Sequence, residues 1–349
     1  MTDAVIVGID SGGTRTNVEV SVEGASVVRR SYEVSHALSG SLAPDQYAAC
    51  MRRILAPLDA QLDGVDPTLP VYAFFSAAGF TRWVRDDFVD AMMDVCPDFA
   101  DGRIVAAGAA NDAVSLLLGM RSQGVVIAGT GSNVVVRTPD GDVYQVGGHE
   151  WVACDYGSAF WIGLRALRQA YRDFEAGNES VLLQRLYEQY SIRPGDERRL
   201  TAKLRDLAIA DANTKREIAR FAADVCQAAE RGDLEAQNIV KAEAEDLADV
   251  MAGGLRRRYT TAQLAEGIDL VQCGSVLNNE FYRTSFEAQI DMRLRSPSAG
   301  RSEIRWQRVA TGGQAALNLA RDLQDTAEDL GDIDLMFRPV VVRFSPRQR

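Results

Sequence analysis

The sequence predicts an α/β protein built from two related halves. In the first hundred residues, apolar runs of strand length alternate with runs whose apolar residues recur at helical spacing. An apolar strand, a turn of Gly, Thr and Ser and a second strand occur at 5–22 and again at 125–136, roughly 120 residues apart. Such a repeat indicates an internal duplication. Residues 157–259 are rich in Ala, Leu, Arg and Glu, and we expect an almost entirely helical insertion there.

The elements of the first half follow in order along the chain. The helix expected at 44–62 begins with Pro44, which suits a first helical turn because that N–H would have no partner. The helix expected at 111–119 has Asn111 in the N-cap position. One further helix is expected at 82–95, and strands are expected at 5–7, 17–22, 26–32, 71–75 and 103–107.

The second half repeats the pattern of strands and helices on either side of the helical insertion. Strands are expected at 125–128, 134–137, 143–146, 268–272 and 304–309, and helices at 278–292 and 314–323. We therefore expect one domain at 1–110 and a second at 111–325 that carries the helical region. Residues 326–349 are expected to form an edge strand or a tail.

Composition excludes several classes of function. The net charge of −11 argues against a broad nucleic-acid surface, because binding to phosphate backbones requires an excess of Lys and Arg. The sequence shows neither a transmembrane span nor a signal peptide, so we expect a cytoplasmic protein with neither nucleic acid nor membrane as a partner. A homodimer formed through the helical region is compatible with the sequence, but nothing in it requires one.

Cysteine and histidine are too few and too scattered to suggest a metal cluster or histidine-based catalysis. The five cysteines are scattered without a C-x-x-C pair, and there are only two histidines. Carboxylates must therefore carry out any proton transfer. The three lysines are Lys203, Lys215 and Lys241. All three lie in the helical stretch, so we expect no Walker-type lysine near the glycine turns.

The turn at 8–16 has the composition of a phosphate-binding loop. Glycines let a backbone approach a phosphate closely, and successive N–H groups form a concavity that binds anions. Asp10, at the end of the preceding strand, could hold Mg²⁺ beside that phosphate. The alternative is a glycine-rich hairpin turn that binds no ligand.

Five motifs together make the chain similar to the actin-like ATPase and sugar kinase superfamily. They are the two glycine hairpins, an Asp that opens the helix between them, Gly-Ser-Val-Leu at 274–277, and Asp-Tyr-Gly-Ser-Ala-Phe-Trp-Ile-Gly at 155–163. Within the superfamily, the chain is most similar to the N-acetylglucosamine kinase and BadF/BadG-type ATPase group, over residues 5–321. The resemblance implies two actin-like (ribonuclease H-like) domains, each a mixed five-stranded sheet with helices, with a cleft between them.

The resemblance also implies a set of site residues, with ATP and Mg²⁺ as cofactors. Asp112 would act as the general base toward the acceptor hydroxyl, and Asp10 would orient Mg²⁺ through water. The residues implied to bind ATP are Gly12, Gly13, Thr14, Arg15, Thr130, Gly131, Ser132, Gly274 and Ser275. The residues implied to bind the acceptor are Ser76, Asn111, Asp112, Gly129, Thr130, Asn133, Gly148 and Asp155.

Three of these positions also have an interpretation in which the residue has only a structural role. Asp112 could be a charge favoured by the N-terminal end of its helix, and Asp155 could cap the helix that runs through Trp161. The turn at 274–275 could be a plain strand-to-helix connection.

The acceptor side departs from the family's pattern. Glu150, Cys154 and Tyr156 stand where the family tends to carry Gly, Gly and Glu. The segment 35–39 lacks the asparagine with which hexosamine kinases contact the sugar. The nucleotide half of the pattern is therefore regular, whereas the acceptor pocket is altered.

The resemblance implies an ATP-dependent kinase of a hydroxyl, by default O6, of an amino sugar such as N-acetylglucosamine or glucosamine. Other sugar-like acceptors are N-acetylmannosamine, N-acetylmuramic acid or a cyclitol. An alternative of another class is that the protein is a BadF-type ATPase that activates a partner reductase. That function uses an iron–sulfur cluster held by paired cysteines, and Cys154 and Cys273 have no partner nearby in the sequence. A non-catalytic nucleotide sensor would be expected to lack Asp10 or Asp112, and both are present.

Overall fold

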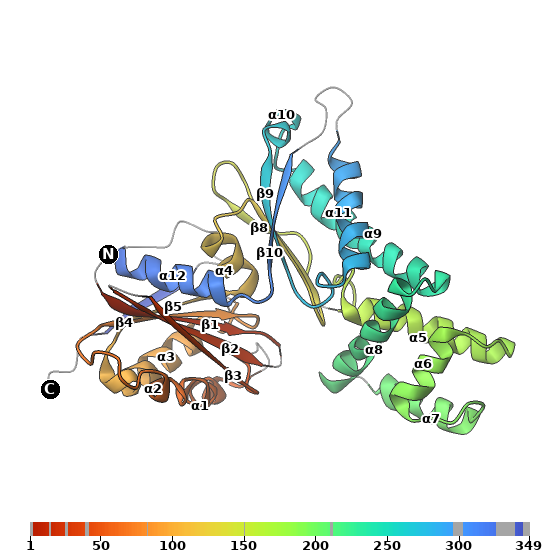
Figure 1. Ribbon diagram of the computed structural model, residues 1–349, viewed down its shortest axis with the longest axis horizontal. Helices are drawn as coiled ribbons and strands as arrows, with labels where there is room; N and C mark the ends of the chain where they lie inside the picture. Colours follow the sequence, from red (N-terminus) through yellow and green to blue (C-terminus); the bar gives the residue numbers. More distant parts are fainter. Residues whose placement is uncertain are drawn as a thin grey trace. The chain divides into compact units, whose positions relative to one another are not determined.

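The computed structural model forms two compact units (Figure 1). The first comprises Met1–Gln123, Arg137–Tyr144 and Thr311–Arg349, and the second comprises Gly124–Val136 and Gln145–Ala310. Within these spans, the structure describes residues 3–13, 15–24, 27–38, 42–81, 83–149, 151–209, 212–295, 303–325 and 339–344.

The first unit is a mixed sheet covered by helices on both faces. Its strand order is β11-β5-β4-β1-β2-β3, in which β1, β2 and β3 are antiparallel neighbours and β4 and β5 run parallel to β1. The sixth strand, β11, pairs antiparallel with β5. The sheet therefore has one strand more than the five implied by the resemblance, and the added strand is the edge strand that is one of the two forms expected for 326–349. The strands are β1 (Ala4–Ser11), β2 (Thr16–Glu23), β3 (Val28–Val34), β4 (Val71–Ala77), β5 (Ile104–Asn111) and β11 (Val340–Arg343).

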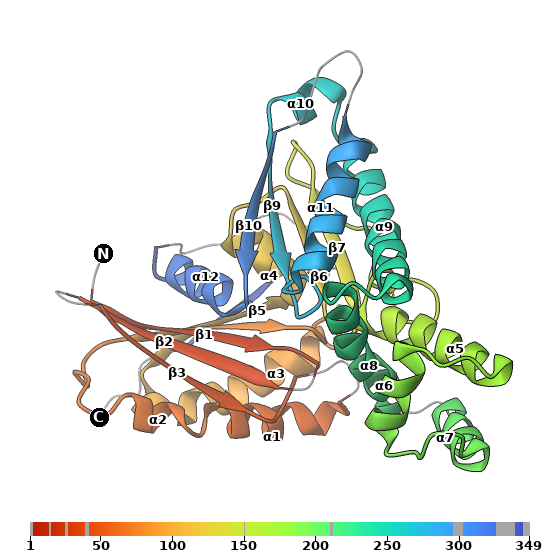
Figure 2. The ribbon, with the colours of Figure 1, turned by 45° about the vertical axis from the view of Figure 1, so that its right-hand side comes forward.

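Two sets of helices enclose this sheet. Figure 2 shows α1, α2 and α3 on one face and α4 and α12 on the other. Apolar side chains of the first set, such as Met51, Ile54 and Phe88, are fully or almost fully buried because they pack against the strands. The helices are α1 (Pro44–Leu55), α2 (Leu58–Gln61), α3 (Arg85–Val95), α4 (Asp112–Gly119) and α12 (Gly313–Asp325), with short 3-10 turns at Cys96–Asp98 and Ala100–Gly102.

The second sheet has five strands in the order β10-β9-β6-β7-β8, and all of them except β8 lie wholly or mostly in the second unit. β7 pairs antiparallel with β6, while β9 runs parallel to β6 and β10 runs parallel to β9. Taken in chain order, these strands occupy the same places as β1 to β5 of the first sheet, as an internal duplication predicts. The strands are β6 (Gly124–Ala128), β7 (Ser132–Arg137), β8 (Val143–Gln145), β9 (Ile268–Cys273) and β10 (Ile304–Val309).

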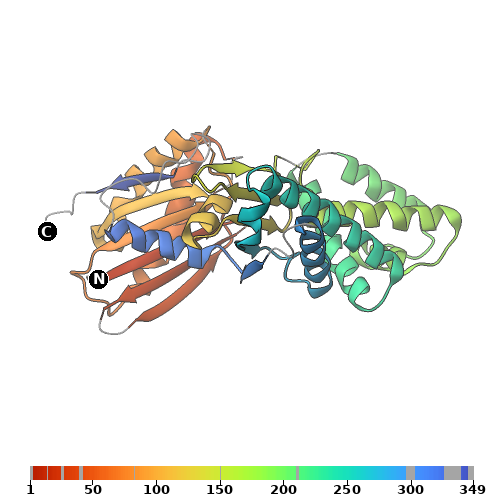
Figure 3. The same ribbon diagram turned by 90° about the horizontal axis from the view of Figure 1, so that it is seen from above.

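Most of the second unit is helical, as the sequence predicts for 157–259. In Figure 3 the green helices of this region gather beyond the strands of their own unit, and Figure 2 shows α9 and α11 side by side along one face of that sheet. Within the described ranges, none of the helices combines the length and the apolar character that crossing a membrane requires. The helices are α5 (Ala159–Ala176), α6 (Val181–Tyr190), α7 (Glu197–Ala208), α8 (Ala212–Glu230), α9 (Leu234–Arg256), α10 (Thr261–Ala265) and α11 (Glu280–Leu294).

The two units do not follow the boundaries 1–110 and 111–325 expected from the sequence, because α4 and α12 belong to the first unit. Close main-chain contacts account for the place of α12. A Cβ at Gly8 of β1 would lie 2.6 Å from the main-chain nitrogen of Leu317. A Cβ at Gly119 would lie 2.4 Å from the carbonyl oxygen of Ala315. Only glycine leaves room for such contacts, so the last helix of the repeat returns to the first sheet.

The contact between α5 and α8 depends in the same way on Gly163. A Cβ there would lie 2.1 Å from the carbonyl oxygen of Ile218 in α8, whereas a Cβ at Gly253 in α9 would meet nothing within 4 Å. We expect Gly163→Ala to destabilise the protein by about 1–3 kcal/mol through overpacking. Gly253→Ala, also inside a helix, should stabilise it by about 0.4–1 kcal/mol. Urea unfolding measures both changes, and equal effects of the two substitutions would contradict the close contact.

Candidate functional site

The first glycine hairpin ends in a short, open tip. The pairing of β1 with β2 runs to Ser11 opposite Thr16, and the main-chain N–H of Gly12 donates to the carbonyl of Arg15 at 3.1 Å. A Cβ at Gly13 would meet nothing within 4 Å, so this position is open to a ligand. The Arg15 guanidinium pairs with Glu33 at 3.2 Å on the exposed surface. The expected contact at Thr14 lies outside the described residues.

Three of the sequence-predicted residues meet at the carboxyl ends of neighbouring parallel strands. Asp10 of β1 lies opposite Ser76 of β4, and the next position of β4 lies opposite Asn111, which ends β5. Asp112 follows directly as the first residue of α4. The carboxyl ends of parallel strands are where α/β proteins bind ligands. The Ser76 hydroxyl is buried without a hydrogen-bond partner in the described part of the chain, whereas the Asn111 side chain caps α4 by accepting the N–H of Ala113 at 3.1 Å.

Two carboxylates of this edge are held in an environment that disfavours their charge. Burial raises the pKa of Asp10 to about 6, and the negative charge of the nearby Asp112 contributes to the rise. The Gly312 N–H, which donates to Asp10 at 2.7 Å, lowers the pKa and so opposes the rise. Burial also raises the pKa of Asp112 to about 6, against the N–H of Ala113 at 2.8 Å. A Cβ at Gly312 would lie 2.5 Å from Asp10, so only glycine allows this contact.

These carboxylates suit a hard divalent cation. Neither forms an ion pair with a basic side chain of the described residues, and their mutual repulsion would be relieved by Mg²⁺. Those residues contain no group of three or more His, Cys, Asp or Glu side chains that could enclose a metal. Mg²⁺ usually takes one or two carboxylates together with waters and substrate phosphates, so a small donor set of this kind fits it.

The second glycine hairpin is docked on the start of α5. The carbonyl of Gly129 accepts the N–H of Ala159 at 2.8 Å, and the carbonyl of Thr130 accepts the N–H of Phe160 at 3.3 Å. Ser158 caps the helix through its side chain. The first N–H groups of α5 are thereby used, and the hairpin is fixed relative to the helix.

A lysine from a distant helix lies beside this hairpin, although the sequence offers no Walker-type lysine at the glycine turns. Lys215 of α8 reaches Asp155, with the ammonium nitrogen 2.7 Å from Oδ2, and Asp155 is only 3% exposed. A Cβ at Gly131 would lie 2.5 Å from the Asp155 carboxylate and 3.1 Å from the Lys215 nitrogen. Gly131, Asp155 and Lys215 therefore form one group. The sequence contains Lys215 but gives no sign that it faces a turn more than 80 residues earlier.

Hydrogen bonds with two side chains distant in sequence hold the turn that carries Asp155. Gly157 has a positive φ of 69°, and its N–H donates to the Glu243 carboxylate at 3.0 Å. Its carbonyl accepts the Tyr282 hydroxyl at 2.9 Å. Glu243 is 1% exposed and pairs with Arg165, and burial raises its pKa to about 7. Sequence reasoning missed Glu243 and Tyr282, because each lies more than 80 residues from the turn that it holds.

Asn133 and Gly148 lie together beside this group in the second unit. Gly148 has a positive φ of 73°, and a Cβ there would lie 2.8 Å from Asn133 Oδ1. That oxygen is buried with no hydrogen-bond partner among the described residues. It is therefore an unsatisfied acceptor that lies beneath the Gly148 turn. Of the departures from the family pattern, Tyr156 is 39% exposed, Cys154 is half-buried, and Glu150 lies outside the described residues.

A cavity of about 490 Å³ in the second unit is lined by two of the residues expected to bind ATP. Thr130 of the hairpin and Ser275 of the turn after β9 both line it. Gly274 has a positive φ of 110°, and a Cβ there would lie 2.3 Å from the carbonyl oxygen of Ala128. The turn is thus pressed against the end of β6. The long wall of the cavity is α8, whose contribution the sequence did not suggest.

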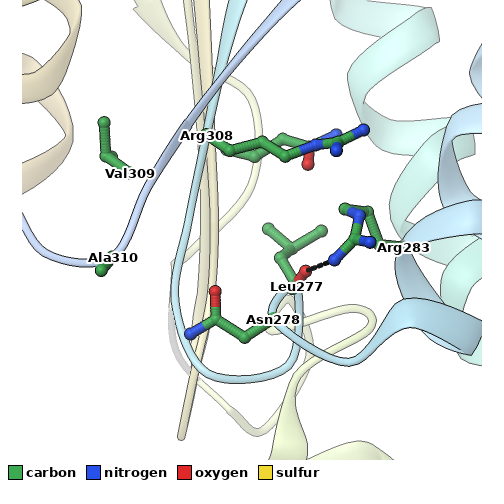
Figure 4. A pocket seen from close by; sticks show the side chains of 7 residues that line it. Leu277, Asn278, Arg283, Arg308, Val309 and Ala310 are labelled. Carbon is green, nitrogen blue, oxygen red and sulfur yellow. Dashed lines mark hydrogen bonds between the residues drawn. The ribbon is translucent and has the colours of Figure 1, made fainter.

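A smaller cavity of about 100 Å³ lies beside the same turn (Figure 4). Two arginines line it, but each is already engaged by the protein. Arg308 pairs with Glu287 at 2.9 Å, and Arg283 donates to the carbonyl of Leu277 at 3.3 Å, as the figure shows. We therefore regard this cavity as part of the support of the turn.

The predicted residues thus fall into two groups. In the first unit the group contains Gly12, Gly13, Asp10, Ser76, Asn111 and Asp112. In the second unit it contains Gly129, Thr130, Gly131, Asn133, Gly148, Asp155, Gly274, Ser275 and Ser132, which is 8% exposed at the start of β7.

The Lys215–Asp155 pair predicts energetic coupling. We expect Lys215→Met, Asp155→Asn and the double variant to give a coupling energy of about 1–3 kcal/mol in urea unfolding. The exposed pair of Arg185 and Glu188 in α6, treated in the same way, should give less than about 0.5 kcal/mol. A coupling no larger than that of the control pair would show that the contact does not persist in solution.

Comparisons with known proteins support this architecture. N-acetylmuramic acid/N-acetylglucosamine kinase of Clostridium acetobutylicum is 23% identical over 243 residues, which cover 69% of this chain and 76% of that protein. A provisionally assigned N-acetylglucosamine kinase from Chromobacterium violaceum matches with a TM-score of 0.66 and 21% identity over 91% of this chain and 99% of that one. A ROK family glucokinase from Streptomyces griseus, solved with glucose and AMPPNP, matches with a TM-score of 0.50 and 15% identity. The match covers 92% of this chain and 99% of that one.

The structural likenesses show that the chain has the two-domain fold of actin-like sugar kinases. Residues 7–300 match the sequence model of one family within that fold. Since this match covers most of the chain, the protein belongs to the BadF/BadG/BcrA/BcrD ATPase family.

Proposed function

We propose that this protein is an ATP-dependent kinase that phosphorylates a hydroxyl group of an amino sugar. The observation that carries the proposal is the placement of Asp112 beside Asp10, at the carboxyl ends of parallel strands and with a raised pKa. Phosphoryl transfer requires a base near the acceptor hydroxyl and neutralisation of the phosphate charge. Asp112 and Asp10 provide groups suited to these two tasks.

Asp112 accepts the proton of the attacking hydroxyl. Its pKa of about 6 is closer to neutrality than that of an ordinary aspartate, which makes it a better proton acceptor while it remains largely ionised at pH 7. Asp10, oriented by the Gly312 N–H, would hold Mg²⁺ through water. The cation, when bound, neutralises charge on the transferring phosphoryl group. Gly12 and Gly13 offer main-chain N–H groups to the phosphates.

The nucleotide occupies the cavity of the second unit. Thr130 lines it at the hairpin, and Ser275 lines it after β9. At about 490 Å³ its size is suited to a nucleotide, since small-molecule pockets are typically about 300–1,000 Å³. Membership in an ATPase family and the AMPPNP bound by the Streptomyces griseus relative support ATP as the donor.

The acceptor is N-acetylglucosamine, glucosamine or another sugar-like polyol, namely N-acetylmannosamine, N-acetylmuramic acid or a cyclitol. Asn133 offers a buried oxygen without a partner among the described residues, and Asp155 presents a carboxylate at the adjacent turn. The name of the Clostridium acetobutylicum relative supports an acceptor of this class. O6 is the hydroxyl that we expect to react.

A panel of hexoses, hexosamines, N-acetylhexosamines, N-acetylmuramic acid and cyclitols, assayed for ATP-dependent phosphorylation, tests the proposal. With the best acceptor, Asp112→Asn should keep nucleotide binding but lower turnover by on the order of 10²-fold or more. Asp86→Asn is the matched control, because Asp86 also lies in the first turn of a helix of the same unit but is exposed. Phosphorylation of none of these compounds, or full activity of Asp112→Asn, would refute the proposal.

The rate should also depend on the protonation of Asp112. The reaction needs the ionised carboxylate, whose pKa is raised to about 6, so activity is present above this pH and lost below it. We expect log kcat/KM to fall with a slope of at least one below about pH 6. Circular dichroism at each pH separates this loss from unfolding. A rate that stays constant down to pH 5 would show that Asp112 is not the base.

A further inference from the structure

The long wall of the 490 Å³ cavity is a single face of α8. The lining positions 216, 220, 223, 227 and 230 recur every three or four residues, so they form one stripe along the helix. From Arg216 to Glu230 this stripe spans about 21 Å, at 1.5 Å per residue. Between its ends, Ala219, Ala222 and Ala223 leave room for a flat ligand.

One end of the stripe is positively charged. Arg216 and Arg220 line the cavity there, and the neighbouring Lys215 lies against the Gly131 turn. Neither arginine forms an ion pair within the part of the chain that the structure describes, although nearly all other lining residues are apolar or neutral. Two like charges four residues apart on a helix repel each other and destabilise it slightly. In a chain of net charge −11, such a pair facing a cavity indicates an anionic ligand.

The other end of the stripe has the opposite character. Glu230 lines the cavity and accepts a hydrogen bond from the Asn279 side-chain amide at 2.7 Å. The Asn279 oxygen in turn accepts the N–H of Tyr282 at 3.0 Å, so the amide is held in place. The Glu230 carboxylate can accept hydrogen bonds from a ligand but repels phosphate. Its position therefore assigns an uncharged, donor-bearing part of the ligand to this end.

We propose that α8 fixes the direction of the bound nucleotide, with Arg216 and Arg220 binding its phosphates and Glu230 accepting hydrogen bonds from its nucleoside. The inference rests on the proposed use of this cavity for ATP and adds which residues recognise each part of the nucleotide. The arginines supply phosphate-binding charge from a helix distant in sequence from both glycine hairpins. Phosphate and guanidinium groups match in geometry as well as in charge.

A series of ligands with increasing phosphate number separates the two ends. Binding of adenosine, AMP and ADP to the full chain is measured by titration calorimetry at constant Mg²⁺ for wild type, Arg216→Ala, Arg220→Ala and Glu230→Gln. We expect either arginine variant to change adenosine affinity less than twofold and to weaken ADP binding by about tenfold or more, since hydrogen bonds to charged groups contribute about 1.5–3 kcal/mol. Glu230→Gln should weaken all three ligands by the same factor.

Arg231→Ala is the matched control, because Arg231 is exposed just beyond the end of α8 and does not line the cavity. It should bind all three ligands as the wild type does. Arg220→Lys should recover part of the ADP affinity because it keeps the charge. Equal losses of adenosine and ADP in the arginine variants, or no loss, would overturn the role of α8. If the unaltered protein bound none of the three ligands, the kinase proposal itself would fail.

Discussion

The structure depends on places where main chain meets main chain without an intervening side chain. Gly119 against α12, Gly163 against α8 and Gly274 against β6 each lie where a Cβ would be less than 2.5 Å from a carbonyl oxygen. Because tightly packed interiors transmit strain, a methyl group at any of them would displace a whole element. Each contact sets one part of the candidate site: α12 brings Gly312 to Asp10, α8 forms the cavity wall, and the turn after β9 closes it.

The buried carboxylates differ in the partners that they have within the described residues. Glu243 pairs with Arg165 and accepts the Gly157 N–H, so it holds the turn that carries Asp155. Asp10 and Asp112 have raised pKa values and accept main-chain N–H groups, with no ion pair to a basic side chain of the described residues. Leaving two neighbouring buried carboxylates without a cation is unfavourable. A bound divalent cation would offset this cost by relieving the repulsion between the two carboxylates.

The elements near the glycine turns could be predicted from local sequence. β1, β2, β6 and β7 and the capped start of α4 lie where alternation and the Asn111 cap place them. The expected family is confirmed by the match over residues 7–300. The helix expected at 44–62 is interrupted, since α1 ends at Leu55 and α2 begins at Leu58. Pro57 between them cannot supply the N–H that a continuous helix would use.

By itself the sequence determined the repeated strand–turn–strand pattern, the helical character of the insertion, and the residue types available for chemistry, because these follow from short-range periodicity and composition. Tertiary structure alone decided that Lys215 reaches Asp155 and that Arg216, Arg220 and Glu230 face one cavity. It also decided that α12 joins the first sheet. These contacts join residues far apart in the chain. Their positions depend on how helices pack, which a local pattern does not encode.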